Sequence, residues 1–199
     1  MDKRWTTLLD EARAAHARLP ALAGFCAFPD DFTEQMVTPH HIPAADLMCN
    51  DPNLFSEGFE GFRDALIAAG PLAQWRETYK GTAIAEDFLN RFACYEFIGQ
   101  DAPFGTDRMR GFVVYQPPGL HYPWHHHPAE EMYVVLAGEA EFAIEGEGSK
   151  TLRAGATVYH RSMVPHALTT HQHPILAYVL WRNNFNIKPV LTYPDEVPG

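Results

Sequence analysis

The second half of the chain reads as a series of short strands, and this feature constrains the fold more than any other. After residue 111, short apolar runs alternate with turn residues, at 112–115, 132–136, 157–159, 166–170 and 175–181. The segment 139–145 alternates strictly, so that Ala140, Phe142 and Ile144 share one face while the glutamates face water. This regular spacing predicts a mainly β fold, a small antiparallel barrel or sandwich.

The first half of the chain has helical spacing instead. Leu8, Ala12, Ala15 and Leu19 recur at helical intervals until Pro20, and a second helix is predicted to end near residue 70. Residues 72–79 and 84–97 are expected to carry further helices. We therefore predict a mostly helical N-terminal lobe over residues 1–105, a β-barrel over 106–193 and a frayed tail over 194–199.

Composition excludes several classes of function. Fifteen basic and 25 acidic residues give a formal charge of −10, which disfavours nucleic acid and anionic membranes as partners. We find no apolar stretch near the roughly 20 residues that span a bilayer, and no apolar run typical of a secretory signal. Cys26, Cys49 and Cys94 are an odd number at wide spacings, typical of reduced thiols. These features predict a cytoplasmic protein.

Histidines are concentrated in one segment, since four of the 11 lie within residues 121–127. On an extended strand, His125 and His127 point to the same face and His126 points away. A turn at residue 128 returns the chain and brings Glu131 toward the same point, and a later strand delivers His166. Neutral imidazoles with one carboxylate suit Zn²⁺, Fe²⁺, Mn²⁺, Co²⁺ or Ni²⁺, so we expect one divalent ion in the barrel.

The spacing of these residues resembles the cupin family. The first cupin motif is matched by Gly119, His125, His127, Glu131 and Gly138. The second motif is matched only at Gly155 and His166, because Arg161, Met163 and Thr170 stand where the general pattern has proline, glycine and asparagine. The resemblance implies a single cupin domain, a small antiparallel β-barrel or jelly roll.

The residues around the motif narrow the resemblance. The segment 121–133 reads His-Tyr-Pro-Trp-His-x-His-Pro-Ala-Glu-Glu-x-Tyr, in a chain of 199 residues with a helical front half. This combination is similar to the cupin-type dimethylsulfoniopropionate (DMSP) lyases, most of all to the DddQ type. It implies a carbon–sulfur lyase (dimethylpropiothetin dethiomethylase) of marine bacteria, which cleaves a small zwitterionic substrate, DMSP, into dimethyl sulfide and acrylate.

That chemistry assigns roles to several aromatic residues. A divalent ion that binds the substrate carboxylate acidifies the α-hydrogen, and a base must remove it. Tyr133 shares the face of Glu131. Tyr133 and Tyr122 are the two candidates for this base, because a nearby cation favours the phenolate form of tyrosine. A cationic sulfonium is attracted to aromatic faces, which Trp181, Trp124 and Tyr159 could supply.

Other interpretations stay open at this point. His125 could line the pocket instead of binding the metal, and Tyr122 or Tyr133 could be ordinary packing residues. The same ligands serve other cupin enzymes, such as an iron-dependent dioxygenase or an isomerase acting on a small acid. A non-catalytic cupin that binds a small ligand is a third reading. A homodimer is left open, since sheet edges often pair between subunits.

Overall fold

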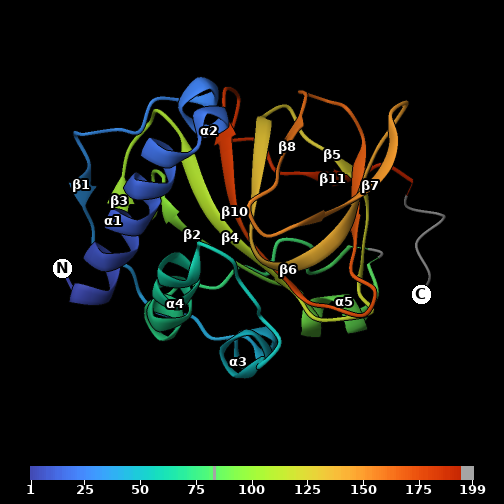
Figure 1. Cartoon of the computed structure of the whole chain (residues 1–199), viewed down its shortest axis with the longest axis horizontal. Helices are drawn as coiled ribbons and strands as arrows, with labels where there is room; N and C mark the ends of the chain where they lie inside the picture. The colour runs from blue at the N-terminus through green and yellow to red at the C-terminus, as the bar shows by residue number, and fades with distance from the viewer. Residues whose placement is uncertain (83, 194–199) are drawn as a thin grey trace.

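The computed structural model describes residues 1–82 and 84–193. Helices dominate the N-terminal part, and most of them lie at one end of the molecule, while the strands of the C-terminal part form a barrel at the other (Figure 1). The first elements are α1 (Lys3–Arg18), α2 (Pro20–Phe25), β1 (Thr33–Glu34), α3 (Pro43–Asn50), α4 (Glu60–Ala69), the 3₁₀ helix η1 (Gly70–Leu72) and α5 (Glu86–Arg91). The strands that follow are β2 (Ala93–Ile98), β3 (Phe104–Gly105), β4 (Arg110–Gln116), β5 (His121–His126), β6 (Glu130–Ile144), β7 (Gly148–Arg153), β8 (Thr157–His160), β9 (His166–Thr169), β10 (Ile175–Arg182) and β11 (Val190–Leu191).

The long strand β6 organises the barrel. Its first half pairs antiparallel with β10 on one side and β8 on the other, and its second half pairs with β7 and β9. The strand bends at Gly138, whose φ is +70°, and a Cβ atom there would lie 1.8 Å from the carbonyl oxygen of Pro174. Only glycine fits this bend. The structure confirms the predicted mainly β fold, a small antiparallel barrel with a helical N-terminal lobe.

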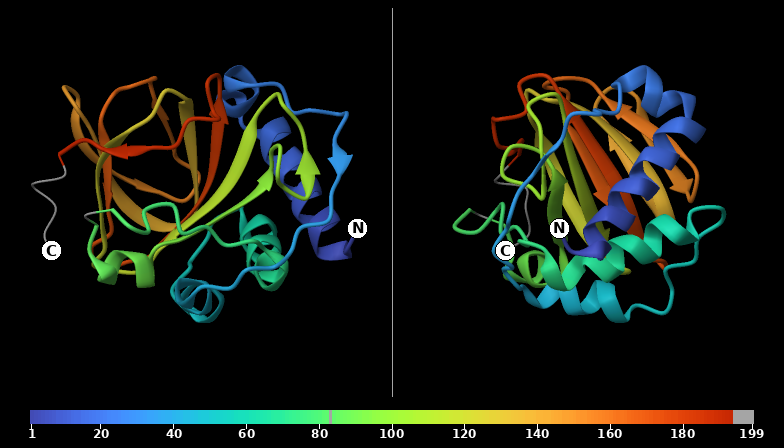
Figure 2. Two further views of the ribbon diagram at one scale, coloured as in Figure 1. Left: turned by 180° about the vertical axis from the view of Figure 1, so that it is seen from behind. Right: turned by 90° about the vertical axis from the view of Figure 1, so that its left-hand side faces the viewer.

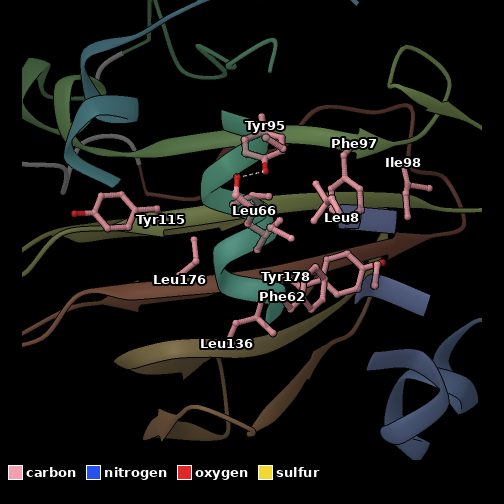
Figure 3. Packing of buried hydrophobic residues seen from close by; sticks show 14 of the residues in the cluster. Leu8, Phe62, Leu66, Tyr95, Phe97, Ile98, Tyr115, Leu136, Leu176 and Tyr178 are labelled. Carbon is pink, nitrogen blue, oxygen red and sulfur yellow. Dashed lines mark hydrogen bonds between the residues drawn. The ribbon is translucent and has the colours of Figure 1, made fainter. Parts of the chain in front are cut away.

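The central strands of the sheet are buried on both faces. In β10, Leu176, Tyr178 and Leu180 belong to the hydrophobic cluster shared with the helices, while Val179 and Trp181 belong to the barrel interior. Helices α1 and α4 lie against the outer face of the sheet (Figure 2), and Figure 3 shows the side chains that pack between them. This double burial explains why the run at 175–181 is continuously apolar instead of alternating.

Helix α1 shows how the sequence directs this packing. Asp2 caps its N-terminus by accepting a hydrogen bond from the backbone N–H of Arg4 at 2.9 Å. Leu8 and Ala12 are fully buried, as helical spacing along one face requires. On the sheet side, the hydroxyl of Tyr95 donates a 2.8 Å hydrogen bond to the carbonyl oxygen of Leu66 in α4 (Figure 3), which ties the helices to the strands.

Several expected helices differ from the structure. The helix predicted over residues 84–97 is wrong in its second half, because α5 ends at Arg91 and residues 93–98 form β2, which pairs with β4. Of residues 72–79, only Leu72 belongs to a helix, the 3₁₀ turn η1. The first helix ends before Pro20 as predicted, since α1 stops at Arg18, and Pro20 then begins the short helix α2, because proline fits the first turn of a helix.

The predicted boundary at residue 105 falls within the sheet, since β2 pairs with β4 of the barrel part and β3 pairs with β2. The division into two units therefore stays a prediction, and the tail at 194–199 lies outside the described residues.

Throughout residues 1–82 and 84–193, every helix is too short or too polar to cross a bilayer. Cys26, Cys49 and Cys94 are free thiols.

Candidate metal and active site

Three buried imidazoles meet inside the barrel. His125 lies on β5, His127 follows that strand, and His166 begins β9, which pairs with β5 opposite His125. The ring centroids of His125 and His166 are 4.2 Å apart, and those of His127 and His166 are 5.1 Å apart. One ring nitrogen from each lies within 4.8 Å of the others. His126 points away, and its Nδ1 is 2.9 Å from the hydroxyl of Thr192.

The backbone fixes which nitrogen each imidazole presents. Nδ1 of His125 lies 2.8 Å from the carbonyl oxygen of Pro123, Nδ1 of His127 lies 2.9 Å from that of Ala129, and Nδ1 of His166 lies 3.0 Å from that of Val164. A carbonyl oxygen only accepts, so each Nδ1 carries the proton and each Nε2 offers a lone pair. Within the described part of the chain, Nε2 of His127 and of His166 has no hydrogen-bond partner.

Glu131 lies at the centre of this group. It sits on β6 directly opposite Trp181 of β10 and His160 of β8. The indole N–H of Trp181 donates to Oε1 at 2.6 Å, and Nδ1 of His160 lies 2.8 Å from Oε2. Nε2 of His127 and of His166 lie 3.6 and 3.2 Å from the same Oε2.

Charge and burial set the protonation of the cluster. Burial alone would raise the pKa of Glu131, but His127, His160 and His166 lower it well below its usual value, so the carboxylate is ionised. Burial, assisted by His166, lowers the pKa of His125 well below its usual value. Burial opposes protonation of His127, yet Glu131 raises the pKa of that imidazole.

This donor set fits a divalent transition-metal ion. Zn²⁺ and similar ions prefer neutral imidazole nitrogens together with carboxylate oxygens. Here the imidazole tautomers are fixed by second hydrogen bonds, as is typical of histidine ligands, and buried lone pairs without partners face the carboxylate. Ligand atoms of His125, His127 and His166 lie within 4.8 Å of one another, and so do those of Glu131, His160 and His166, so the structure brings the four residues predicted as ligands together inside the barrel, with His160 beside them.

A narrow pocket opens beside Glu131. It is lined by both predicted catalytic tyrosines, by Trp181 and by further apolar side chains, among them Phe112 and Cys94. Phe112 packs edge-on against Trp181 with ring centroids 5.3 Å apart, and Trp181 is tilted over His127 at 4.3 Å. A largely apolar, aromatic pocket with a few polar groups, here Glu131, Arg76 and Thr78, is a typical small-molecule site.

The two tyrosines differ in their surroundings. Tyr122 stacks on His125 with centroids 3.9 Å apart, and its hydroxyl is hydrogen-bonded to that of Tyr79 at 2.7 Å. The ring of Tyr133 lies 5.5 Å from that of His160. Burial raises the pKa of both Tyr122 and Tyr133 well above the usual value, so each is a neutral phenol unless a cation lies nearby.

Two residues expected at the substrate site lie elsewhere. Trp124 lines a separate hollow on the outside of the barrel, beside Glu141 and Tyr193. Tyr159 is 40% exposed, and its hydroxyl donates to Glu130 at 2.6 Å. The structure does not bring either ring to the pocket beside Glu131, because each lies one residue from an inward-facing histidine and so points the opposite way.

Sequence reasoning missed two residues of the site. His160 continues the alternation of its strand, in which Tyr159 faces outward, and this parity was the signal that could have found it. Tyr79 comes from the loop between η1 and α5, where neither periodicity nor a motif marks it.

The departures from the second cupin motif are accommodated locally. Met163, in place of glycine, adopts the left-handed φ of +63°. The buried hydroxyl of Thr170, in place of asparagine, donates to the carbonyl oxygen of Pro117 at 2.6 Å and accepts from the N–H of Leu120 at 3.0 Å. The turn and the strand end are therefore kept by different residue types.

Comparison with known proteins identifies the family of this chain. Residues 31–177 match the dimethylsulfoniopropionate lyase family. Dimethylsulfoniopropionate lyase DddQ of Ruegeria pomeroyi DSS-3 is 52% identical over 194 residues, which cover 98% of this chain and 96% of that protein. The crystal structure of DMSP lyase DddQ from Ruegeria pomeroyi DSS-3 has a TM-score of 0.96 and covers 98% of this chain and 99% of that one. A chain from the crystal structures of DMSP lyases RdDddP and RnDddQII is 37% identical, with a TM-score of 0.92 and coverage of 96% and 98%. The protein described here therefore belongs to the dimethylsulfoniopropionate lyase family.

Proposed function

We propose that the protein is a carbon–sulfur lyase that cleaves DMSP into dimethyl sulfide and acrylate in the pocket beside Glu131. The observation that carries the proposal is the 52% identity to DMSP lyase DddQ over nearly the whole of both chains. The aromatic pocket next to a buried group of imidazoles and one carboxylate supports it.

We further propose that His125, His127, Glu131 and His166 hold one divalent ion. A divalent cation bound there would withdraw electrons from the substrate carboxylate and so acidify the α-hydrogen. The protein's own contribution is preorganisation, because backbone carbonyls hold the three imidazoles in one tautomer before any ion binds. The choice among zinc, iron, manganese, cobalt and nickel stays a prediction.

Elimination requires a base, and Tyr133 and Tyr122 are our candidates. Both line the same pocket as Glu131, so either hydroxyl can reach a small substrate there. The phenolate oxygen takes the α-proton, the electrons of that C–H bond form the carbon–carbon double bond, and the bond between the β-carbon and sulfur breaks. The leaving group keeps the bonding pair and departs as neutral dimethyl sulfide, and acrylate remains.

Recognition of the sulfonium is assigned to the face of Trp181. This ring lines the pocket and is held in place by its hydrogen bond to Glu131, so its indole is already oriented when substrate enters. Glu131 already accepts hydrogen bonds on both oxygens, which leaves cation–π attraction as the main force on the sulfonium. Trp124 and Tyr159 do not line this pocket and have no part in that recognition.

The direct test is to add DMSP to the purified protein and measure dimethyl sulfide in the headspace and acrylate in solution. Equal molar release of both products is expected. Absence of both, from folded protein supplied in turn with each of the five metals, would contradict the proposal. A homodimer, a cytoplasmic location and a marine bacterial source stay predictions beside it.

A further inference from the structure

His160 contacts the one acidic member of the candidate metal site. It ends β8, and it lies directly opposite Glu131 across the pairing of β6 with β8. Trp181 lies opposite Glu131 on the other side, across the pairing of β6 with β10. Each neighbour contacts one carboxylate oxygen, Trp181 at 2.6 Å and His160 at 2.8 Å. The orientation of the carboxylate is therefore set by two side chains from two different strands.

Packing alone does not explain a histidine at this position. The residue is only 2% exposed, and its ring stacks on that of His166 at a centroid distance of 4.0 Å and an angle of 20°. Its Nδ1 is hydrogen-bonded to Glu131, but its Nε2 is buried without a hydrogen-bond partner among the residues that the structure describes. A buried nitrogen without a partner costs stability, so an apolar side chain would suit a purely structural position better.

We infer that His160 is a positioning residue that holds Glu131 in the orientation in which its carboxylate binds the metal ion. The inference rests on the proposed metal site and deepens it. The Nδ1–H of His160 occupies one lone pair of Oε2 and fixes the rotation of the carboxylate. Nε2 of His166 lies 3.2 Å from the same oxygen. A small rotation of the Glu131 carboxylate would therefore change the spacing between this oxygen and the imidazole nitrogens that are proposed to bind the ion with it.

A matched pair of substitutions separates this hydrogen bond from packing. In His160→Asn, the side-chain N–H₂ group is attached to Cγ as Nδ1 is in histidine, so a donor toward Glu131 is kept. His160→Leu has nearly the same shape as asparagine without the donor. Each metal-free variant is titrated with Zn²⁺ against a chromophoric chelator, and its thermal unfolding is measured without metal.

We expect His160→Leu to weaken Zn²⁺ affinity by about 10- to 100-fold, the usual effect of losing a partner that orients a ligand, and His160→Asn to stay within about threefold of the parent protein. His126→Leu is the control, because this histidine faces Thr192 outside the site and its loss should leave the affinity unchanged. If the leucine variant does not fold, His160→Ala takes its place in the same comparison.

Parent-like affinity in the variant without the donor would overturn the inference, and so would an equal loss in the asparagine variant. Absence of Zn²⁺ binding by the parent protein would overturn it as well. Release of dimethyl sulfide by the parent protein is measured separately. A parent protein that binds Zn²⁺ but releases no product would contradict the proposed function while leaving the inference about His160 standing.

Discussion

The hydroxyls of Tyr79 and Tyr122 lie 2.7 Å apart in a buried hydrogen bond that joins the loop before α5 to the barrel interior. Tyr122 also stacks on His125, so the loop contacts a candidate metal ligand through a single intervening ring. The Tyr79 ring packs edge-on against Tyr122 at 5.7 Å. The loop therefore contributes to the order of the site although it lies outside the barrel.

Replacing Tyr79 by phenylalanine should lower kcat by about fivefold and leave metal content unchanged. The reason is that one oriented hydrogen bond, worth about 1 kcal/mol, no longer holds the hydroxyl of Tyr122. Steady-state kinetics of dimethyl sulfide release give kcat and KM separately. Tyr193→Phe is the matched control at the surface, and an unchanged kcat in Tyr79→Phe would show that Tyr122 needs no such support.

Loss of one candidate ligand should remove metal and activity together. His166→Ala is expected to contain less than about a tenth of the metal of the parent protein, because two imidazoles and one carboxylate bind a divalent ion much more weakly than three imidazoles with the carboxylate. Elemental analysis and product release are measured on the same preparation. His126→Ala should behave as the parent does, and full activity of His166→Ala in chelator would rule out the metal site.

Removing the catalytic phenol should stop the reaction without disturbing the metal. If Tyr133 or Tyr122 is the base, its phenylalanine variant keeps fold and metal but loses turnover by about 100-fold or more. Rates near those of the parent in both variants would place the base on another residue. A large loss in one variant and a small loss in the other would distinguish the base from its neighbour.

Removing the aromatic face should weaken substrate binding. Trp181→Leu is expected to raise KM by up to about thirtyfold, since a cation–π contact contributes roughly 0.5–2 kcal/mol. Because Trp181 also donates to Glu131, metal content is measured in parallel. Trp124→Leu should leave KM unchanged. The idea fails if a neutral thioether acid inhibits the parent protein as strongly as a sulfonium analogue of the same shape.

His16 should make the fold sensitive to acid. Burial between α1 and the sheet lowers the pKa of His16 from 6.5 to about 4, so the folded protein keeps it neutral while the unfolded chain becomes protonated. The contribution of neutral His16 to the free energy of unfolding is fully present above pH 6.5. It decreases as the pH drops toward 4, by at most about 3 kcal/mol. Urea unfolding at pH 7 and pH 5 should show a smaller decrease in His16→Leu than in the parent protein.

Strand pairing explains which site residues could be predicted from the sequence. The spacing of His125, His127 and Glu131 is local: alternation puts the two histidines on one face, and the turn at residue 128 returns the chain so that Glu131, on β6, faces them. The same rule puts Trp124 on the face opposite His125, and it puts His160 on the inner face next to an outward Tyr159. It does not predict Tyr122, which has the parity of Trp124 but lies inside, because the pairing of β5 with β9 shifts register between Tyr122 and His125. Tyr79 could not be predicted, because its contact with Tyr122 depends on the path of a loop.

The error over residues 84–97 has a different cause. Phe88 and Phe92 stand four residues apart, which is helical spacing, and the helix does include Phe88. The following segment, 93–98, is apolar on nearly every residue because it is buried on both faces, so it shows no alternation. Periodicity alone cannot distinguish such a strand from a buried helix.

Burial of the sheet on both faces has a consequence for any attempt to shorten the protein. Without α1 to α4, the outer surfaces of Tyr178, Leu176 and Leu180 would form a continuous apolar wall in contact with water. Exposed apolar patches of this kind promote aggregation. A barrel expressed alone should precipitate unless this wall is redesigned, so the helices act as a solubilising cover for the strands that carry the site.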